Sequence, residues 1–294
     1  MSDVVDATIA WFKREARPLP WRGESAGDID AWAVLISEFM LQQTQASRVI
    51  PYFEAWLARW PRPSALAADE AGEAVRAWGR LGYPRRALWL HRAATEIAER
   101  HGDVVPRDVE TLLELPGIGT YTARAIASFA YAERHPVVDT NTRRVLARLV
   151  HGRAAAGAPS ASDLDDMLTL LPADPVRARL FNAAAMELGA TVCTARAPSC
   201  GECPIALWCE WRGSGYPDNA PAVRRQAAFE GSDRQVRGRI MALLRSRVEA
   251  VPVERALEAA GEGGVRDAQQ PARALDSLVA DGLLVEFEGC VRLP

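Results

Sequence analysis

The sequence predicts an all-α fold that ends in a small α+β module, and three observations support this prediction. Apolar residues recur every three or four positions through most of the chain, as they do in helices with one buried face. Proline and glycine separate these periodic segments, as is typical of turns. The alternation of apolar and polar residues that indicates a half-buried strand is nearly absent before residue 280.

The periodic segments give the expected position of each element in order. We expect helices at 30–45, 65–79, 85–100, 108–114, 120–132, 141–150, 161–171 and 176–190. The polar segment 212–231 contains proline and glycine, lacks periodicity and is interpreted as a linker. After it, three short helices are expected at 233–247, 253–260 and 271–280, followed by a hairpin of 283–287 and 290–293. This combination is typical of a winged-helix-like module.

The composition limits the kinds of function. The 294 residues, 49% of them hydrophobic, suffice for one large domain or for two to three small ones. No run of 18 apolar residues exists and the charged N-terminus has no secretory hydrophobic region, so we expect a cytoplasmic protein without membrane association. The net charge of −3 means that any nucleic-acid binding must come from a local basic surface. Lys13 is the only lysine among the 35 Lys and Arg residues.

Four cysteines lie close together with the spacing Cys-x6-Cys-x2-Cys-x5-Cys. They are Cys193, Cys200, Cys203 and Cys209. Thiolates suit soft metals and iron–sulfur clusters, and a reducing cytosol keeps them free. A zinc site more often has two closely spaced pairs, and only one such pair occurs here. We therefore favour an iron–sulfur cluster over zinc, and both over disulfides. Cys290 lies far away in the sequence and is interpreted as a packed side chain.

A glycine-containing motif, Leu115-Pro116-Gly117-Ile118-Gly119, separates the predicted helices 108–114 and 120–132. Its two glycines allow a tight turn and a close approach to a ligand. Backbone N–H groups at the start of the next helix can bind a phosphate. The motif predicts a helix-hairpin-helix element that holds duplex DNA without reading its sequence, and an ordinary turn between helices is the alternative.

Two carboxylates are candidates for chemistry. Asp139 precedes the predicted helix 141–150, where an aspartate is a common N-cap, and Thr140 or Asn141 could cap equally well. On local grounds the cap is favoured. Glu38 lies on the predicted helix 30–45 with apolar residues four positions before and three positions after it. Burial against such neighbours raises the pKa of a carboxyl and favours a neutral acid, whereas a partly exposed helix glutamate is the alternative.

At this point the motifs resemble those of the MutY-type adenine DNA glycosylases of base excision repair. The blocks that carry the resemblance are Leu19-Pro20-Trp21-Arg22, Ser37-Glu38-Phe39-Met40-Leu41-Gln42-Gln43-Thr44-Gln45, Arg80-Leu81-Gly82-Tyr83, Leu115-Pro116-Gly117-Ile118-Gly119 with Tyr121-Thr122-Ala123, Val138-Asp139-Thr140-Asn141 and the four cysteines. Together they extend over roughly residues 5–215. Sister glycosylases that remove oxidised pyrimidines carry Gln at the position of Glu38, so this block is specific.

The resemblance implies a two-lobed helix-hairpin-helix DNA glycosylase fold with a 4Fe-4S cluster bound by the four cysteines. Residues 1–27 with 138–217 would form the cluster lobe, 28–137 a six-helix barrel lobe, 218–231 a linker and 232–294 the winged-helix-like module. The implied partner is double-stranded DNA containing a mispaired adenine, which is flipped into the protein. A monomer that acts at the bacterial nucleoid is expected.

The resemblance also implies the roles of individual residues. Neutral Glu38 would protonate adenine and later activate water, and anionic Asp139 would stabilise or trap the sugar cation. Residues around this catalytic pair are Tyr121 and Asn141. Residues implied to bind the adenine or the DNA are Trp21, Arg22, Leu41, Gln42, Gln43, Thr44, Tyr83, Leu115, Gly117 and Gly119. For Leu41 and Tyr83, helix packing and core burial are equally good interpretations.

The lysine content supports hydrolysis alone. Glycosylases that also cleave the strand use an amine to form a Schiff base. Sisters of the endonuclease III type carry this lysine after the hairpin, where the present chain has Tyr121. The single Lys13 precedes the catalytic blocks, so we expect a monofunctional enzyme with little or no lyase activity.

The chain departs from the family pattern in several places. Pro84 follows Tyr83 where a second tyrosine is typical, and Ala183 replaces a Gln or Glu near the adenine. The segment 23–28 is interpreted as an insertion. The 63 residues after Gly231 replace a longer Nudix-like domain, and their nine arginines against ten acidic residues do not indicate a phosphate-binding surface. Selectivity for adenine opposite 8-oxoguanine over adenine opposite guanine therefore stays open.

Two alternatives remain. A thymine or uracil mismatch glycosylase of the same fold can also carry a tyrosine after the hairpin, but the block around Glu38 argues against it. A non-catalytic iron–sulfur regulator that binds DNA would not need both Glu38 and Asp139.

Overall fold

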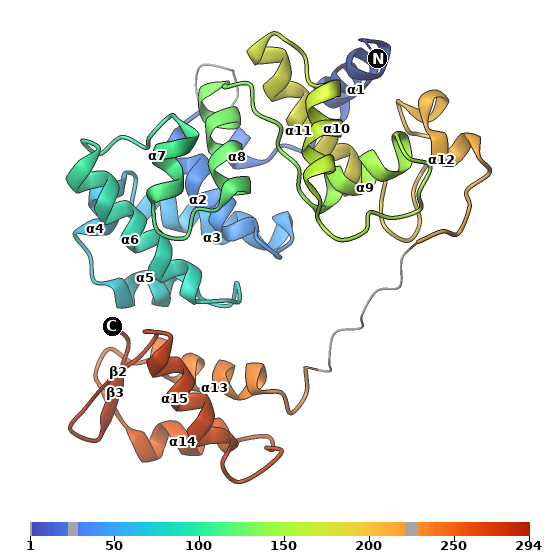
Figure 1. Ribbon diagram of the computed structural model, residues 1–294. Helices are drawn as coiled ribbons and strands as arrows, with labels where there is room; N and C mark the ends of the chain where they lie inside the picture. The colour runs from blue at the N-terminus through green and yellow to red at the C-terminus, as the bar shows by residue number, and fades with distance from the viewer. Residues whose placement is uncertain (1, 23–28, 221–228) are drawn as a thin grey trace. The chain divides into compact units, whose positions relative to one another are not determined.

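The computed structural model describes residues 2–22, 29–220 and 229–294, and Figure 1 shows it. The chain divides into two compact units, each described separately. The first unit consists of Met1–Glu38, Pro106–Glu114 and Ile118–Val223, and the second of Phe39–Val105, Leu115–Gly117 and Arg224–Pro294. The boundary falls inside helix α2 (Ala31–Leu41), so this helix contributes to both units.

In the described part of the first unit, all the regular secondary structure is helical. Besides the start of α2, it contains α1 (Ser2–Glu15), η1 (Pro20–Arg22), α7 (Val109–Glu114), α8 (Thr120–Tyr131), α9 (Thr140–Leu149), α10 (Ala161–Leu170), α11 (Pro175–Thr191), η2 (Ala206–Trp208) and α12 (Glu210–Gly213). Helix α11 packs against α1, α8 and α9. A continuous apolar core joins α1, α9, α10 and α11, with Trp11, Phe12, Leu146, Phe181 and Leu188 among its buried members. This packing fixes the N-terminus of α9 against α11.

The second unit combines barrel helices with the C-terminal module, residues 232–294. Its helices and strands are the end of α2, α3 (Ala46–Arg59), α4 (Pro63–Ala67), α5 (Ala71–Trp78), α6 (Arg85–Arg100), α13 (Asp233–Arg245), β1 (Val251–Pro252), α14 (Val253–Gly261), α15 (Gln270–Ala280), β2 (Val285–Phe287) and β3 (Cys290–Arg292). Trp56, Trp60 and Trp78 form a buried edge-to-face cluster between α3 and α5. Such aromatic pairs add specific geometry to the burial of apolar surface.

The C-terminal module has three helices and a small antiparallel sheet, drawn in orange to red in Figure 1. The strand order is β1-β3-β2, with Val251 opposite Val291 and Phe287 opposite Cys290. The predicted hairpin of β2 and β3 is confirmed, and the sheet has a third strand, β1, that the sequence analysis missed. A two-residue strand is too short to show the alternation by which strands are recognised.

The predicted all-α fold with a C-terminal α+β module is confirmed, and two predicted helices are corrected. The helix expected at 30–45 ends at Leu41, because the backbone at Gln43 is left-handed with φ of +55°. The helix expected at 65–79 is two helices, α4 and α5, separated by residues 68–70. One apolar stripe can continue over two short helices, so periodicity alone did not reveal the break.

The predicted insertion 23–28 lies outside the described residues, as does most of the predicted linker 218–231. The predicted division into two lobes and a separate module stays a prediction, and the compact units place the module with Phe39–Val105. No helix in the described part of the chain is long and apolar enough to cross a membrane.

Candidate active site

Glu38 lies on the buried face of α2 and is only 5% exposed. The residues around it on the helix, including Leu35, Ile36 and Phe39, are fully buried apolar side chains. Burial raises the pKa of Glu38 to about 7; a hydrogen bond from Tyr121 lowers it, and the charge of Asp139 raises it. The carboxyl is therefore substantially protonated near neutral pH, as the sequence predicted from its apolar neighbours.

Tyr121 is the hydrogen-bond partner of Glu38. It lies in the first turn of α8, directly after the glycine motif. Burial raises the pKa of Tyr121 well above its ordinary value, and the charges of Glu38 and Asp139 raise it further. The phenol therefore stays protonated and donates its hydrogen bond to the Glu38 carboxyl. The structure thus joins three residues of the predicted site, Glu38, Tyr121 and Asp139, in one electrostatic cluster.

Asp139 is the N-cap of α9, and the same carboxylate belongs to the cluster around Glu38. Its Oδ1 accepts a hydrogen bond from the Thr142 backbone N–H at 2.7 Å. Its Oδ2 accepts a hydrogen bond from the Asn141 side-chain amide at 2.8 Å. The N-terminus of a helix favours an anion at this position. The cap interpretation is therefore confirmed, and it supplies the means by which the carboxylate is held in place.

Asn141 is fixed from its other side. Its Oδ1 accepts a hydrogen bond from the Arg144 guanidinium at 2.8 Å, and the same guanidinium binds the Gly189 carbonyl on α11 and the Cys193 carbonyl, each at 2.7 Å. A Cβ at Gly189 would lie 2.7 Å from the Asn141 carbonyl oxygen. Only glycine lets α11 approach the first turn of α9 this closely. Neither Arg144 nor Gly189 was predicted from the sequence.

Asn182 positions the segment that leads to Asp139. Its side chain is fully buried and accepts a hydrogen bond from the Val137 N–H at 3.1 Å. Its amide donates to the Ser128 hydroxyl and to the His135 carbonyl, both at 2.9 Å. A buried amide with all these partners satisfied fixes the backbone rigidly. The sequence signal was an asparagine between apolar residues of α11, next to buried Phe181.

A second buried glutamate, Glu187, organises the segment that carries Trp21 and Arg22. It accepts hydrogen bonds from the Arg17 guanidinium at 2.6 and 2.9 Å and from Arg22 at 2.7 Å. Burial alone would raise the pKa of Glu187, but hydrogen bonds from Arg17 and the charge of Arg22 outweigh it and lower the pKa to about 2. Glu187 was missed, although a carboxylate next to buried Leu188 gave the same sequence signal as Glu38.

The structure places the residues predicted to bind adenine in this ion-paired segment. Arg22 is at the end of η1, donates to the Arg17 carbonyl at 2.9 Å and lies 5.0 Å from the centre of the Phe12 ring. Trp21 is half-buried beside it. Ala183, the departure from the family pattern, packs against the apolar core of the first unit.

The two glycines of the motif differ in backbone conformation and in the space around them. Gly117, in the second unit, has φ of +78°, and a Cβ there would lie 2.6 Å from Trp89. Gly119, in the first unit, is the N-cap of α8 with an extended backbone, and the space around it is open. Leu115 is buried. Gly117 is thus required by conformation and packing, whereas Gly119 leaves the helix N-terminus accessible to a ligand.

The remaining predicted DNA-binding residues lie at two loops of the second unit. Leu41 ends α2 and the first loop, with Gln42, Gln43 and Thr44, follows it, whereas the second loop carries Tyr83 before α6. Gln43 and Tyr83 are exposed, and both have left-handed backbones. Buried Arg86 binds both loops, donating to the Gln42 carbonyl at 2.7 Å and to the Gly82 carbonyl at 3.1 Å. Strain of this kind at exposed side chains is typical of functional loops.

The four cysteines of the predicted cluster site line one pocket together with Arg148, Val192 and Trp211. Within the part of the chain that the structure describes, no three His, Cys, Asp or Glu side chains surround a single metal position, so the fit rests on this common pocket and its donors. Arg148 donates to the Cys193 sulfur at 3.3 Å and lies 4.5 Å from the centre of the Trp211 ring. A cationic donor suits the negatively charged thiolates that bind iron, so these residues fit an iron–sulfur cluster.

Two segments of the sequence match the models of known protein families. Residues 36–161 match the HhH-GPD superfamily of base excision DNA repair proteins, and residues 193–209 match the iron-sulfur binding domain of endonuclease III. The chain is 53% identical over 289 residues to the adenine DNA glycosylase of Mycobacterium tuberculosis, covering 97% of this chain and 92% of the relative. Both chains therefore align over nearly their whole lengths.

Two solved structures have a similar fold. A thermostable thymine-DNA glycosylase aligns with a TM-score of 0.63 and 25% identity, over 71% of this chain and 95% of its own. Endonuclease III in a trapped covalent intermediate with DNA aligns with a TM-score of 0.61 and 20% identity, over 73% of this chain and 96% of its own. The second likeness shows the fold alone. The predicted helix-hairpin-helix glycosylase fold and the 4Fe-4S loop are confirmed.

Proposed function

The chain belongs to the adenine DNA glycosylase family of the helix-hairpin-helix superfamily, and from this premise we propose that it removes mispaired adenine from double-stranded DNA by hydrolysis. The observation that carries the proposal is the buried Glu38 carboxyl, which accepts a hydrogen bond from Tyr121 and lies beside the Asp139 carboxylate that caps α9. One carboxyl is neutral near pH 7 while the other is held where a helix N-terminus favours an anion. This is the pair of opposite charge states that protonation and cation stabilisation require.

Glu38 is the proton donor. Adenine is a poor leaving group until a ring nitrogen is protonated, and a carboxyl with a pKa of about 7 can supply this proton near neutral pH. The bond between C1′ and N9 then breaks, and its electron pair leaves with the adenine. The Glu38 carboxylate formed in this way accepts a proton from water as the water oxygen bonds to C1′, so Glu38 ends the cycle protonated again.

Asp139 stabilises the sugar. The departing adenine leaves positive charge on C1′ and the ring oxygen, as in glycoside hydrolysis. Asp139 faces this charge as an anion, and its two hydrogen bonds from Thr142 and Asn141 fix its position before the reaction begins. A preorganised charge of this kind needs no rearrangement in the transition state. Tyr121 keeps the Glu38 carboxyl oriented through its hydrogen bond.

The enzyme hydrolyses the N-glycosidic bond of the adenine nucleotide and leaves the DNA strand intact. Lys13 lies exposed on α1, and Tyr121 occupies the position after the hairpin where strand-cleaving sisters carry a lysine. An amine is needed to form the Schiff base that leads to strand cleavage. We therefore propose a monofunctional enzyme that acts as a monomer at the bacterial nucleoid.

The DNA is held by separate elements. The open N-terminus of α8 at Gly119 binds a phosphate, and Leu41, Gln42, Gln43, Thr44 and Tyr83 contact the duplex around the base opposite the adenine. A bound 4Fe-4S cluster would cross-link the loop 193–209 through its four cysteines. The opposite base is proposed to be 8-oxoguanine or guanine.

Single-turnover base release tests this function. Duplexes with A:8-oxoguanine, A:G, T:G and U:G pairs are incubated with excess protein and read with and without alkali. We expect release of adenine from the first two, with strand breaks only after alkali. Release from T:G or U:G in their place would assign the chain to the mismatch glycosylases. Duplex binding without any release would identify a non-catalytic DNA-binding protein.

A further inference from the structure

The C-terminal module contacts the barrel helices of its own unit through a small set of specific interactions. The first is at α13, whose C-terminal carbonyls have no partners within the helix. The Arg76 guanidinium on α5 donates from Nη1 to the carbonyls of Leu244, Arg245 and Arg247 at 3.2, 2.6 and 2.7 Å. Its Nε is held by Glu73 at 2.9 Å. A cation at a helix C-terminus is favourable, so Arg76 caps the module from outside.

The second contact is between the module and the buried side of α5. A Cβ at Gly72 would lie 2.4 Å from the Pro294 carbonyl oxygen, so only glycine allows this approach. Arg245 donates from Nε to the Val75 carbonyl at 3.3 Å. Burial lowers the pKa of Arg245 to about 10, and Tyr52 on α3 lies close enough to offset part of this shift.

The third contact is an ion pair at the start of α6. Arg85 donates to Asp281 of the module at 3.2 Å, and Asp281 is held in turn by Arg237 on α13. Arg85 follows directly after the loop Gly79–Pro84, which joins α5 to α6. Through Arg76 and Arg85 the module therefore binds on both sides of this loop in the sequence.

The loop itself is under conformational strain. Gly79 and Tyr83 have φ of +54° and +48°, and Tyr83 is 50% exposed. A non-glycine residue with a positive φ of this kind is strained, and it persists only where its surroundings hold it. The loop is held by Tyr52, whose hydroxyl is 3.4 Å from the Arg80 N–H, by Arg48, which donates to the Arg80 carbonyl, and by Trp78, which donates to the Gly82 carbonyl at 2.9 Å.

We propose that the C-terminal module acts as a brace that holds the loop Gly79–Pro84, so that exposed Tyr83 keeps its strained conformation when it contacts DNA. The module binds Arg76 on the helix before the loop and Arg85, the first residue after it. The inference rests on the proposed function, because it assigns the module to positioning Tyr83. Its charge, nine arginines against ten acidic residues, suits a supporting role better than direct phosphate binding.

A double-mutant cycle in the full chain tests the brace. Arg76→Ala, Tyr83→Ala and the double variant are compared in single-turnover adenine release from an A:G duplex. We expect Arg76→Ala to slow release roughly ten- to a hundredfold, and to slow it little further when Tyr83 is already alanine, because a residue that acts through Tyr83 cannot act without it. Independent losses that multiply in the double variant would overturn the proposal.

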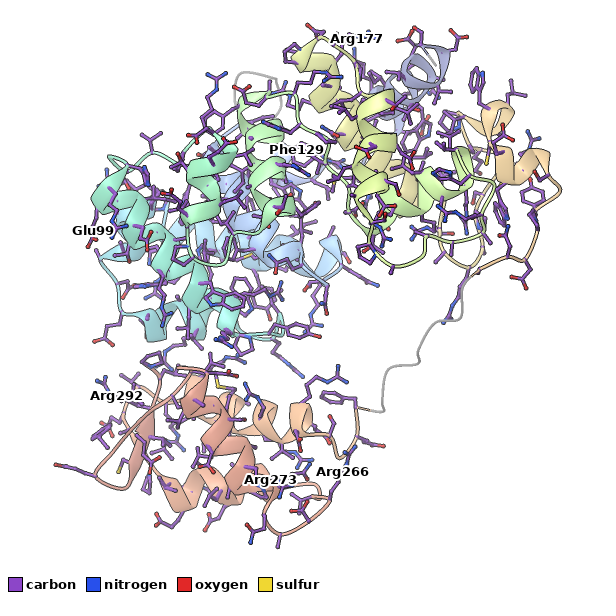
Figure 2. All side chains as sticks on the ribbon, viewed as in Figure 1. Glu99, Phe129, Arg177, Arg266, Arg273 and Arg292 are labelled. Carbon is purple, nitrogen blue, oxygen red and sulfur yellow. The ribbon has the colours of Figure 1, made fainter. Side chains whose placement is uncertain are left out.

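The matched control is Arg273→Ala. Arg273 lies on α15, labelled in Figure 2, and its 56% exposed side chain pairs with Asp267 inside the module. This variant removes the same charge from an exposed ion pair, so we expect wild-type release. If Arg273→Ala slowed adenine release as much as Arg76→Ala, the loss of any positive charge in this unit would explain the effect, and the brace would be contradicted.

Hydrogen exchange gives a reading that does not depend on catalysis. Arg76→Ala should make the backbone amides of residues 79–83 exchange roughly tenfold faster, while those of α8 in the first unit stay unchanged. Unchanged exchange in the loop would refute the brace. If Arg76→Ala does not fold, Arg85→Gln is read by the same two criteria. If the wild type releases no adenine, the proposed function fails, and the exchange measurement still decides whether the module braces the loop.

Discussion

Two glutamates of the first unit are both buried, yet the structure gives them opposite charge states. Glu38 on α2 is 5% exposed and faces a tyrosine and a second carboxylate, and its pKa is raised to about 7. The Glu187 side chain on α11 is 1% exposed and faces Arg17 and Arg22, and its pKa is lowered to about 2. Burial is common to both, so the neighbouring groups decide the charge.

The difference has a structural meaning. Glu187 forms ion pairs with Arg17 and Arg22. These ion pairs attach the segment around Trp21 to α11 and stabilise the fold. Glu38 keeps a proton that water would remove from an ordinary carboxyl, and this proton is available for chemistry. A carboxyl that is neutral in the fold at pH 7 costs stability, and functional sites commonly carry such a cost.

Glu38→Gln should have the largest effect. The amide keeps the shape of the side chain but carries no transferable proton, so we expect the rate of adenine release to fall by about 10³-fold or more. Affinity for an A:G duplex, measured by fluorescence anisotropy, should stay close to that of the wild type. A variant that still releases adenine at a comparable rate would remove Glu38 from the mechanism.

Asp139→Asn should come next. Asparagine is as good an N-cap as aspartate, and its Oδ1 can still accept a hydrogen bond from the Thr142 N–H. Its amide would face the Asn141 amide in place of the Oδ2 acceptor, so the free energy of unfolding should fall by about 1–2 kcal/mol. The anion is lost, however, and release should slow by about 10²–10³-fold, the size typical of a lost electrostatic stabiliser. Release rates and urea unfolding are measured on the same preparation. A large loss of stability with no loss of rate would mean that Asp139 serves only as a cap.

Much of this arrangement was predictable from the sequence, for physical reasons. Glu38 was found because a charged residue on an apolar helix face is visible in the periodicity, and the cysteines because their spacing reflects their ligand geometry. Glu187 and Asn182 carried the same signal, but their partners lie 170 and 45 residues away in the sequence, so only the fold identifies them. The break between α4 and α5 and the brace on the Tyr83 loop likewise depend on tertiary contacts.

The two glutamates should make the free energy of unfolding depend on pH in opposite directions. The pKa of Glu187 is lower in the fold than its ordinary value of 4.5, so its contribution is present above pH 4.5 and is lost as the pH falls toward 2. The pKa of Glu38 is higher than 4.5, so stability falls as the pH rises from 4.5 to 7. Each shift corresponds to about 3 kcal/mol at most.

Replacing either glutamate by glutamine should remove one part of this dependence of the free energy of unfolding on pH. Glu187→Gln should lower the free energy of unfolding at pH 7 by about 2 kcal/mol and remove the dependence between pH 2 and 4.5. Glu38→Gln should raise it at pH 8 and remove the dependence between pH 4.5 and 7. Urea unfolding across this range measures both. Parallel profiles for the two variants would show that burial, and not the partners, sets the charge.

Tyr121→Phe should have the smallest effect, and it tests the cause of the Glu38 pKa directly. The phenol donates to the ionised form of Glu38 and lowers its pKa, so its removal should raise that pKa above about 7. Because adenine release needs the protonated acid, the alkaline limb of the rate profile should move to higher pH by less than about one unit, the usual range for one hydrogen bond. The maximal rate should fall only modestly, since the acid is still present. A limb that moves to lower pH would mean that Tyr121 stabilises the neutral acid, and the hydrogen bond would then have to run from Glu38 to the phenol oxygen.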